Sequence, residues 1–243
     1  MNNLYIVILA YNYQNYIKEC IDSVLIQSYD NYKVCIIDDA STDNTNKIIK
    51  KNINDKFNLV TNKSNKGALY NHIQALANNE IRDNDIVIHI DGDDKLIDKN
   101  TFSIINKAYT DNPDHLVSYG NYITASNNPS ICKPWDKNIT VSNYIAPIGW
   151  IFSHLRTFKY KLWKHINDNS FYDKQGKIFS SAADVAIMKP VLELAGRKRT
   201  MYIQKPLYYY RDNIPTNDHN KNLKDQVRCA LEIKNIKPLK SII

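Results

Sequence analysis

No run of about eighteen apolar residues occurs in the 243-residue sequence, so we expect no integral membrane segment. The first residues, MNNLYIVILAYN, lack the basic flank and the cleavage site of a signal peptide, and their apolar part is typical of a buried strand. The four cysteines lie far apart and form no CxxC pair, which argues against a disulfide framework and a zinc site. Scattered thiols favour a reducing compartment, and we therefore expect a cytoplasmic protein.

A signature of nucleic-acid binding is also missing. The net charge of +7 favours an anionic partner such as a nucleotide, a phosphate, an acidic membrane or a nucleic acid, although solubility alone also explains it. The short basic patches at 159–164 (KYKLWK) and 196–200 (GRKRT) have no aromatic RNA-binding signature beside them. We interpret them as solvated faces, or as a weak peripheral contact with an anionic membrane or an acceptor, and expect no nucleic-acid partner.

The first hundred residues do contain a regular alternation of strand and helix patterns. The expected strands are short and almost wholly apolar, as in parallel sheets covered on both faces, and span residues 4–10, 32–38, 57–61 and 85–90. Between these strands, residues 16–28 and 68–79 have the apolar spacing of amphipathic helices. A further helix is expected to begin after Ser41 or Thr42, either of which can serve as its N-cap. This alternation predicts an α/β fold with right-handed crossovers and a mainly parallel central sheet flanked by helices.

The rest of the chain has shorter and less regular patterns. We expect strands near 116–122, 201–203 and 207–210, and helices over 99–112, 159–165, 184–195 and from Asn220 onward. Pro190 is expected to kink or interrupt the helix in which it lies. Neither an internal repeat nor a linker separates these elements from the first hundred residues, so we expect a single domain over 1–243.

Polar side chains follow three of the expected strands at the point where each strand ends. They are Tyr11 and Asn12, Asp38 and Asp39, and the segment from Asp91 to Asp94. Ligands of parallel α/β sheets bind outside the carboxyl ends of the strands. We therefore expect these three segments to converge on one ligand site.

The last of these segments, HIDGDD, suits a hard divalent cation. In an extended segment Asp91 and Asp93 point the same way and Asp94 points opposite. Two carboxylates on one side suit Mg²⁺ or Mn²⁺, and Gly92 gives the backbone room to approach a ligand. The alternative is a turn in which aspartates cap backbone amides. An EF-hand loop is excluded because Phe102 stands where its closing Glu belongs.

The motifs of the first hundred residues, taken together, resemble those of the family 2 glycosyltransferases, which have the GT-A fold. The resemblance lies in IVILAYNYQNYIKECIDSVLIQSYDNYKVCIIDDASTDNT, in NKG at 65–67, and in HIDGDD with its DXD motif. It implies a Rossmann-like nucleotide-binding half over 1–98 and an acceptor-binding, catalytic half over 99–243. Segments 153–163 and 180–196 resemble small soluble members of the family more loosely.

The resemblance implies roles for individual residues. Those implied to bind the nucleotide-sugar are Ala10, Tyr11, Asn12, Asp38, Asp39, Asn65, Lys66, Gly67, Asp91, Gly92, Trp150 and Arg156. Within this set the Tyr11 ring would pack against the base, and Asp39 would accept a hydrogen bond from it, a contact typical of uracil. Asp93 would be the principal metal ligand with help from Asp91, and His219 would offer an imidazole to the metal or the pyrophosphate.

A catalytic base is implied as well. Inverting members of the family use a carboxylate to deprotonate the acceptor hydroxyl, and Asp184, at the start of an expected helix, matches the segment that carries it. The family's usual Glu-Asp pair is absent because Ala183 precedes Asp184. The alternative is that Asp184 only caps its helix. Trp150 would offer an aromatic platform to a sugar, or else belong to the core, and Arg156 would bind phosphate.

These features predict a metal-dependent, inverting glycosyltransferase with Mn²⁺ or Mg²⁺ as cofactor. It would move one sugar from a nucleoside-diphosphate sugar to a hydroxyl of a glycan, a protein or a lipid. A UDP-sugar is the favoured donor because Asp39 suits uracil, although related enzymes use GDP or dTDP donors. Processive members carry a QxxRW motif and membrane spans, and this sequence has neither. The alternative is a catalytically inactive module that binds a nucleotide-sugar. A nucleotidyltransferase would need a Gly-rich phosphate loop where this chain has AYNYQN.

Overall fold

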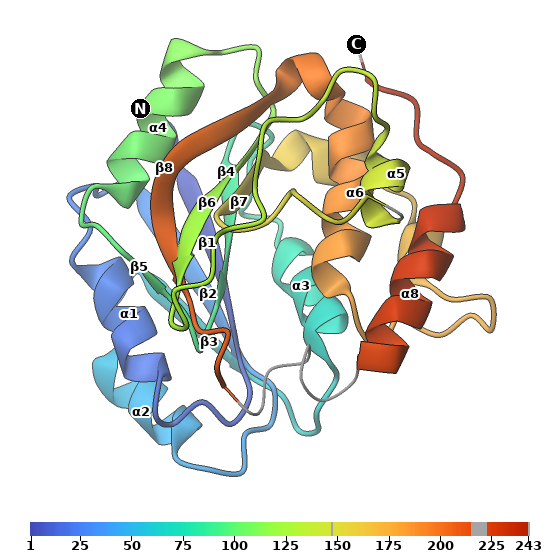
Figure 1. Ribbon diagram of the computed structural model, residues 1–243. Helices are drawn as coiled ribbons and strands as arrows, with labels where there is room; N and C mark the ends of the chain where they lie inside the picture. The colour runs from blue at the N-terminus through green and yellow to red at the C-terminus, as the bar shows by residue number, and fades with distance from the viewer. Residues whose placement is uncertain (147, 215–222, 243) are drawn as a thin grey trace.

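A mixed sheet forms the centre of the computed structural model, which describes residues 1–146, 148–214 and 223–242 (Figure 1). Within those residues the sheet has eight strands in the order β3-β2-β1-β4-β7-β6-β8-β5. The strands are β1 (Leu4–Ala10), β2 (Tyr32–Asp38), β3 (Phe57–Thr61), β4 (Ile86–Asp91), β5 (Lys95–Leu96), β6 (Val117–Thr124), β7 (Arg156–Lys159) and β8 (Thr200–Tyr210). The prediction of an α/β fold with a central sheet flanked by helices is confirmed.

The first four strands are parallel, and their register aligns the ends at which polar residues follow. On one side of β1, Ala10 pairs with Asp38 of β2, and on the other side Leu9 pairs with Asp91 of β4. The strand ends therefore lie along one edge of the sheet. The expected convergence of the three polar segments follows directly from this register.

The side chains of β1 alternate between two hydrophobic cores, one on each face of the sheet. Leu4, Ile6 and Ile8 pack with helices α1 (Ile17–Leu25), α2 (Thr45–Asn52) and α4 (Thr101–Asp111). Tyr5, Val7 and Leu9 pack with α3 (Ala68–Leu76) and α6 (Ala183–Ala195). Figure 1 shows these two sets of helices on opposite faces of the sheet. A strand buried on both faces must be apolar at every position, which is what LYIVILA shows.

The second part of the chain extends the same sheet. Strand β7 is antiparallel to both β4 and β6, and β8 is parallel to β6 and antiparallel to β5. Helices α5 (Val141–Ile145) and α8 (Leu223–Asn235) lie beside α6, and short 3₁₀ turns span Tyr160–His165, Asp168–Phe171 and Arg197–Arg199. Because β7 pairs with β4, residues from beyond position 150 lie next to the acidic segment that ends β4.

Several expectations for individual elements were wrong. Strand β7 was not predicted, and 200–210 forms one strand with a register irregularity instead of two strands. The segment after Lys159 is a 3₁₀ turn instead of an α-helix. Helix α6 continues through Pro190, because ten of its thirteen residues are buried and packing outweighs the lost hydrogen bond. The N-cap of α2 is Asn44 and not Ser41 or Thr42. The Ser41 hydroxyl instead accepts a hydrogen bond from Asn12 N.

All four cysteines are free thiols and buried. Among the residues that the structure describes, no helix combines the length and the apolar character needed to cross a bilayer.

Candidate functional site

A cavity of about 1090 Å³ opens at the carboxyl ends of the parallel strands. Most of the residues implied by the resemblance line it: Ala10, Tyr11, Asn12, Asp39, Asn65, Gly67, Asp91, Asp93, Trp150, Arg156 and Asp184. They come from both parts of the chain, so the cavity lies between the parallel strands and α6. Its volume suits a ligand larger than a single nucleotide base. His219 lies outside the described residues.

Three implied residues do not line this cavity. Asp38 is buried and holds the turn after β2, where its two oxygens accept hydrogen bonds from Ser41 N at 3.1 Å and Asn46 Nδ2 at 2.7 Å. Lys66 contributes its backbone amide to another carboxylate, and its ammonium lies 6.0 Å from the centre of the Tyr70 ring. Gly92 faces β1, because a Cβ added there would lie 2.5 Å from the Leu9 carbonyl oxygen. The room at Gly92 is thus taken by the sheet and not by a ligand.

Asp39 fixes the loop that carries the NKG motif. Its carboxylate accepts hydrogen bonds from Lys66 N at 2.8 Å, Gly67 N at 2.9 Å and Asn62 Nδ2 at 2.7 Å. Only 4% of the residue is exposed. The loop is therefore held against the end of β2 before any ligand arrives, and the contact of Asp39 with a base stays a prediction.

The acidic segment turns immediately after β4, and this corrects the expected orientation of its side chains. Gly92 N donates to Leu9 O at 2.8 Å, and Asp94 N donates to Asp91 O at 3.0 Å, which closes a tight turn. The strand rule of alternating sides does not hold in a turn. Asp94 therefore points toward Asp91 and not away from it: one ligand atom each of Asp91, Asp94 and His154 lie within 4.8 Å of one another.

Burial shifts the titration of two acids in this turn. The pKa of Asp93 is raised from 3.8 to about 7 by burial and by the neighbouring Asp91 charge. Burial, followed by the Asp93 and Asp91 charges, raises the pKa of Asp94 well above its ordinary value. Sequence reasoning did not find the counter-charge, Arg211, whose backbone N donates to Asp94 Oδ1 at 2.7 Å and whose guanidinium donates to Asp93 O. A cation placed among these acids would favour their charged forms.

The contribution of Asp93 to the stability of the ligand-free protein is expected to fall as the pH rises from about 4 to 7. Because the folded-state pKa of Asp93 lies above the unfolded value, its stabilisation is complete below the unfolded pKa and is lost as pH rises through the folded pKa. The slope contributed by one such group is at most about 1.4 kcal/mol per pH unit. Urea unfolding across this range measures it. Asp93→Asn removes the group, so the stability of the wild type relative to this variant should fall as the pH rises; a difference that does not change with pH contradicts the assignment.

Arg156 joins two carboxylates, and its expected contact with a phosphate stays a prediction. Strand β7 sets Arg156 opposite His89 of β4, next to the acidic turn. Its guanidinium reaches Asp91 Oδ2 through Nη2 and Asp184 Oδ2 through Nη1, both at 3.4 Å. The arginine is 5% exposed, whereas each carboxylate side chain remains about one-third exposed to the cavity. One buried cation thus orients both acids.

Asp184 lies in the first turn of α6, as the sequence predicts. The N-cap position is Ala182, a non-glycine residue at φ 57°, so Asp184 is not the cap of its helix. A carboxylate in the first turn is also favoured by the helix dipole. Asp184 therefore presents a fixed, partly exposed carboxylate to the cavity.

Three buried histidines line the same cavity in their neutral form. His72 and His89 stack with ring centroids 4.3 Å apart, and His154 stacks on Tyr208 at 4.4 Å. Burial, together with the Arg156 charge, lowers the pKa of His72 to about 3 and lowers the pKa of His154 well below its ordinary value. A neutral imidazole can accept a hydrogen bond or ligate a metal through its free nitrogen.

Buried polar atoms without a protein partner gather around this cavity. Among the described residues all but one of them, Glu232 Oε2, belong to lining residues: His72 Nδ1, His89 Nε2, Asp94 Oδ2, Trp150 Nε1, His154 Nδ1, Arg156 Nε and Ser181 Oγ. Buried polar groups are nearly always hydrogen-bonded in folded proteins. This concentration of unpaired donors and acceptors therefore marks the cavity as a site for a polar ligand.

The sequence is similar to a known protein family over most of its length. The family model described as glycosyl transferase family 2 matches residues 5–176. EpsE of Bacillus subtilis, named as a glycosyltransferase, is 36% identical over 94 residues, which are 37% of this chain and 32% of that protein. The chain thus spans about a third of the length of this relative.

Two solved structures have the same fold. S. aureus TarS 1–349 in complex with UDP-GlcNAc has a TM-score of 0.65 and 20% identity, over 90% of this chain and 61% of that chain. Glucosyl-3-phosphoglycerate synthase of Mycobacterium tuberculosis, in complex with Mn²⁺, UDP and glucosyl-3-phosphoglycerate, has a TM-score of 0.63 and 14% identity, over 96% of this chain and 80% of that chain. At these identities the likeness is one of fold.

Proposed function

The chain belongs to glycosyl transferase family 2, and from this premise we propose that it is a metal-dependent, inverting enzyme that moves one sugar from a UDP-sugar to a hydroxyl acceptor. We further propose that residues 1–243 act as one catalytic domain, with the donor bound by 1–98 and the acceptor by 99–243. The complexes of TarS with UDP-GlcNAc and of the mycobacterial synthase with UDP support the choice of donor. The observation that carries the proposal is Arg156, which joins the acid expected at the donor to the acid expected to act as base.

The donor is proposed to lie along the carboxyl ends of β1, β2 and β4. Tyr11, of which 41% is exposed, would pack its ring on the base, with Ala10 and Asn12 beside it. The loop over 65–67 would follow the ribose and diphosphate, held in place by its hydrogen bonds to Asp39. A loop ordered in advance lowers the entropy cost of binding.

The donor set around the acidic turn fits a divalent cation. Asp91, Asp94 and His154 would hold it, with Asp93 as a further carboxylate in the same cavity. The unpaired Asp94 Oδ2 and His154 Nδ1 are the observation that supports this fit. We assign Mn²⁺ in preference to Mg²⁺, because an imidazole nitrogen suits a transition ion better than Mg²⁺, and because the mycobacterial synthase was solved with Mn²⁺. When bound, the cation would neutralise charge on the leaving diphosphate.

Asp184 is proposed as the catalytic base. It would accept the proton of the acceptor hydroxyl while the oxygen attacks the anomeric carbon and the bond from that carbon to the UDP oxygen breaks on the opposite face. The product then has the inverted configuration. Arg156 would hold Asp184 in position, as a positioning residue that does not itself touch the reacting atoms.

A thermal-shift panel of UDP-, GDP- and dTDP-sugars, with and without Mn²⁺, tests this function. We expect one UDP-sugar, together with Mn²⁺, to raise the Tm by about 5 to 10 °C at a hundred times its Kd. The part of the Tm rise that depends on Mn²⁺ should disappear in Asp91→Ala. It should persist in Asp30→Ala, which changes an exposed acid that does not line the cavity. Release of UDP from the same donor distinguishes an enzyme from an inactive binding module. Stabilisation without UDP release would favour that module.

A further inference from the structure

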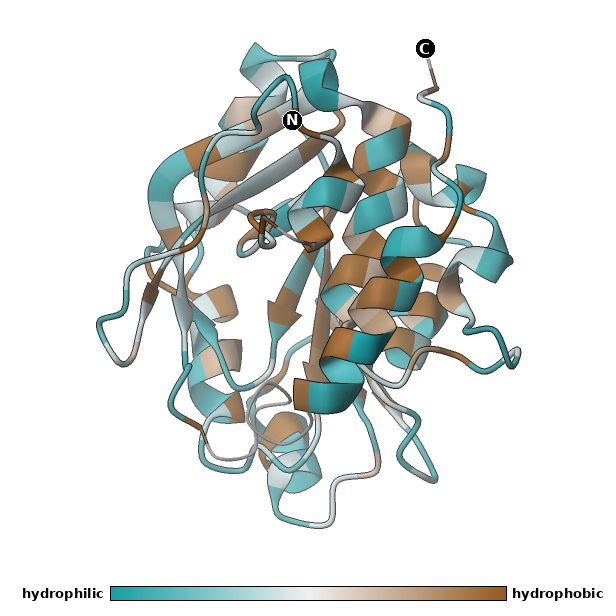
Figure 2. Ribbon diagram, turned by 45° about the vertical axis from the view of Figure 1, so that its right-hand side comes forward, coloured by the Kyte–Doolittle hydropathy of each residue, from teal (hydrophilic) through white to brown (hydrophobic). Residues whose placement is uncertain are grey.

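One wall of the cavity is aliphatic and is formed by helix α8. Leu223, Gln226, Val227 and Ala230 line the cavity, and their spacing of three and four residues places them on one face of the helix. Leu223 is 53% exposed and Val227 is 50% exposed, so their side chains are accessible from the cavity. Figure 2 shows apolar segments alternating with polar ones along α8.

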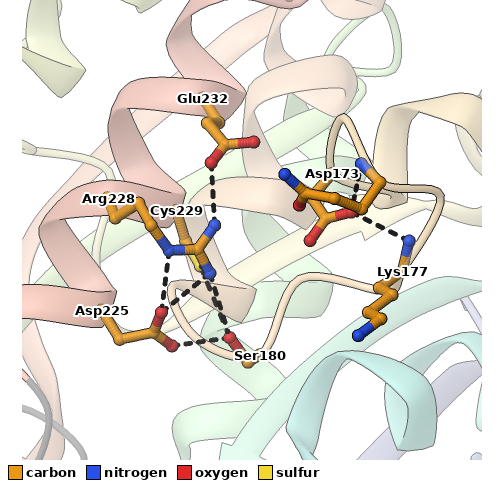
Figure 3. Close-up of polar contacts among 8 residues, drawn as sticks. Asp173, Lys177, Ser180, Asp225, Arg228, Cys229 and Glu232 are labelled. Atoms are coloured by element: carbon orange, nitrogen blue, oxygen red, sulfur yellow. Dashed lines mark hydrogen bonds and ion pairs between the residues drawn. The ribbon is translucent and has the colours of Figure 1, made fainter.

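Other residues of α8 anchor the helix to the protein, which fixes this wall near the base. Cys229 and Ile233 are buried in the core. Ser180 Oγ donates to Asp225 Oδ2 at 2.6 Å, and Arg228 pairs with Asp225 at 2.8 Å (Figure 3). Ser180 lies only four residues before Asp184, so its contacts with α8 hold this helix near the proposed base.

The two ends of the cavity differ sharply in polarity. The donor end carries Asp39, Asp91 and Asp93, whereas α8 offers aliphatic carbon with Gln226 as the one polar side chain among its lining residues. Hydroxyl groups of a sugar that lay on such a wall would lose their hydrogen bonds to water without replacement, which is costly. A hydrocarbon there would gain from leaving water. The base lies between the two ends, where the acceptor hydroxyl must be.

We propose that this α8 wall binds the hydrocarbon part of an amphiphilic acceptor, in which the sugar that carries the reacting hydroxyl is attached to an aliphatic chain. The inference rests on the proposed function, and it narrows the acceptor from glycan, protein or lipid to a lipid-linked sugar. The acceptor hydroxyl meets Asp184 while the chain runs along Leu223 and Val227 toward solvent.

Matched octyl and methyl β-glycosides of glucose, galactose and N-acetylglucosamine test the proposal. Their binding to the full chain is measured by calorimetry in the presence of UDP and Mn²⁺, below the micelle concentration. For the best-bound sugar, the octyl form should bind about tenfold more tightly than the methyl form, which is the gain from about two buried methylene groups. Val227→Ser should bring this ratio close to one. Leu231→Ser, a change to another exposed aliphatic residue of α8 that does not line the cavity, should leave it unchanged.

Two outcomes overturn the proposal. One is an octyl-to-methyl ratio near one in the wild type; the other is a ratio that falls equally in Leu231→Ser, since this would mean detergent binding to the helix in general. Both are separate from a failure of the proposed function. A protein that releases no UDP from any donor disproves catalysis, whatever the glycoside ratio, and a protein that releases UDP with a ratio near one disproves only the amphiphilic acceptor.

Discussion

Asp184→Asn is expected to reduce UDP release by about 10²- to 10⁴-fold, the usual contribution of a general base. An amide has the shape of the carboxylate but cannot accept the proton of the acceptor hydroxyl. The side chain is about one-third exposed to the cavity, so the substitution should cost little stability. Initial rates of UDP release, with the donor that the thermal-shift panel selects, measure the effect.

Donor binding must survive for this result to identify a base. The UDP-dependent rise in Tm should therefore be the same in Asp184→Asn and in the wild type. Asp168→Asn changes an exposed acid on a 3₁₀ turn that does not line the cavity, and it should keep full activity. An Asp184→Asn variant that keeps activity within about threefold of wild type would exclude Asp184 as the base, since a general base typically contributes about 10²- to 10⁴-fold.

Arg156→Ala is expected to lower UDP release by about 10²-fold, which makes it the second largest effect. The buried guanidinium is 3.4 Å from both Asp91 and Asp184, so its loss leaves two acids without their shared partner. Lysine has a single ammonium and cannot contact both carboxylates in the same way, so Arg156→Lys should recover only part of the rate. Both carboxylates are partly exposed, so the loss in unfolding free energy should stay below the roughly 3 to 5 kcal/mol of a fully buried pair.

Two comparisons separate positioning from a structural role for Arg156. Free guanidinium at non-denaturing concentration should restore part of the rate in Arg156→Ala. Lys159→Ala removes another buried cation of β7, whose ammonium donates to Pro113 O at 2.8 Å. It should lower stability without a comparable loss of UDP release. If Arg156→Ala keeps the wild-type rate, the link between Asp91 and Asp184 has no part in turnover.

The donor half of the site was largely predictable from the sequence, because the residues expected to bind the donor follow directly after strands that have a clear apolar pattern. Strands β1, β2 and β4 are mostly apolar, and a polar segment begins at or directly after the end of each. Parallel register then brings Ala10, Asp38 and Asp91 to one edge. The prediction failed one residue beyond β4, because the rule of alternating sides ends where the chain turns, and Asp94 joins Asp91 as a result.

The other half of the site depends on pairings with no local signal. Strand β7 is four residues long and begins and ends with a charged residue, so its pattern resembles a surface loop. Only its antiparallel pairing with β4 places Arg156 between two acids. Arg211 is 117 residues from the acid to which its backbone donates, and its only sequence signal is its place after an aromatic strand. The positions of Arg156 and Arg211 are therefore decided by contacts between distant parts of the chain and not by local secondary-structure propensity.

The position of the metal and the diphosphate is tested most directly by a crystal structure with UDP and Mn²⁺, in which anomalous scattering locates the ion. We predict one manganese ion bonded to Asp91 and to at least one further donor among Asp93, Asp94 and His154, with the UDP diphosphate on the ion and the uracil base beside Tyr11. An ion and nucleotide bound away from the β4 turn, or acids of that turn directed at backbone amides with UDP in place, would contradict it.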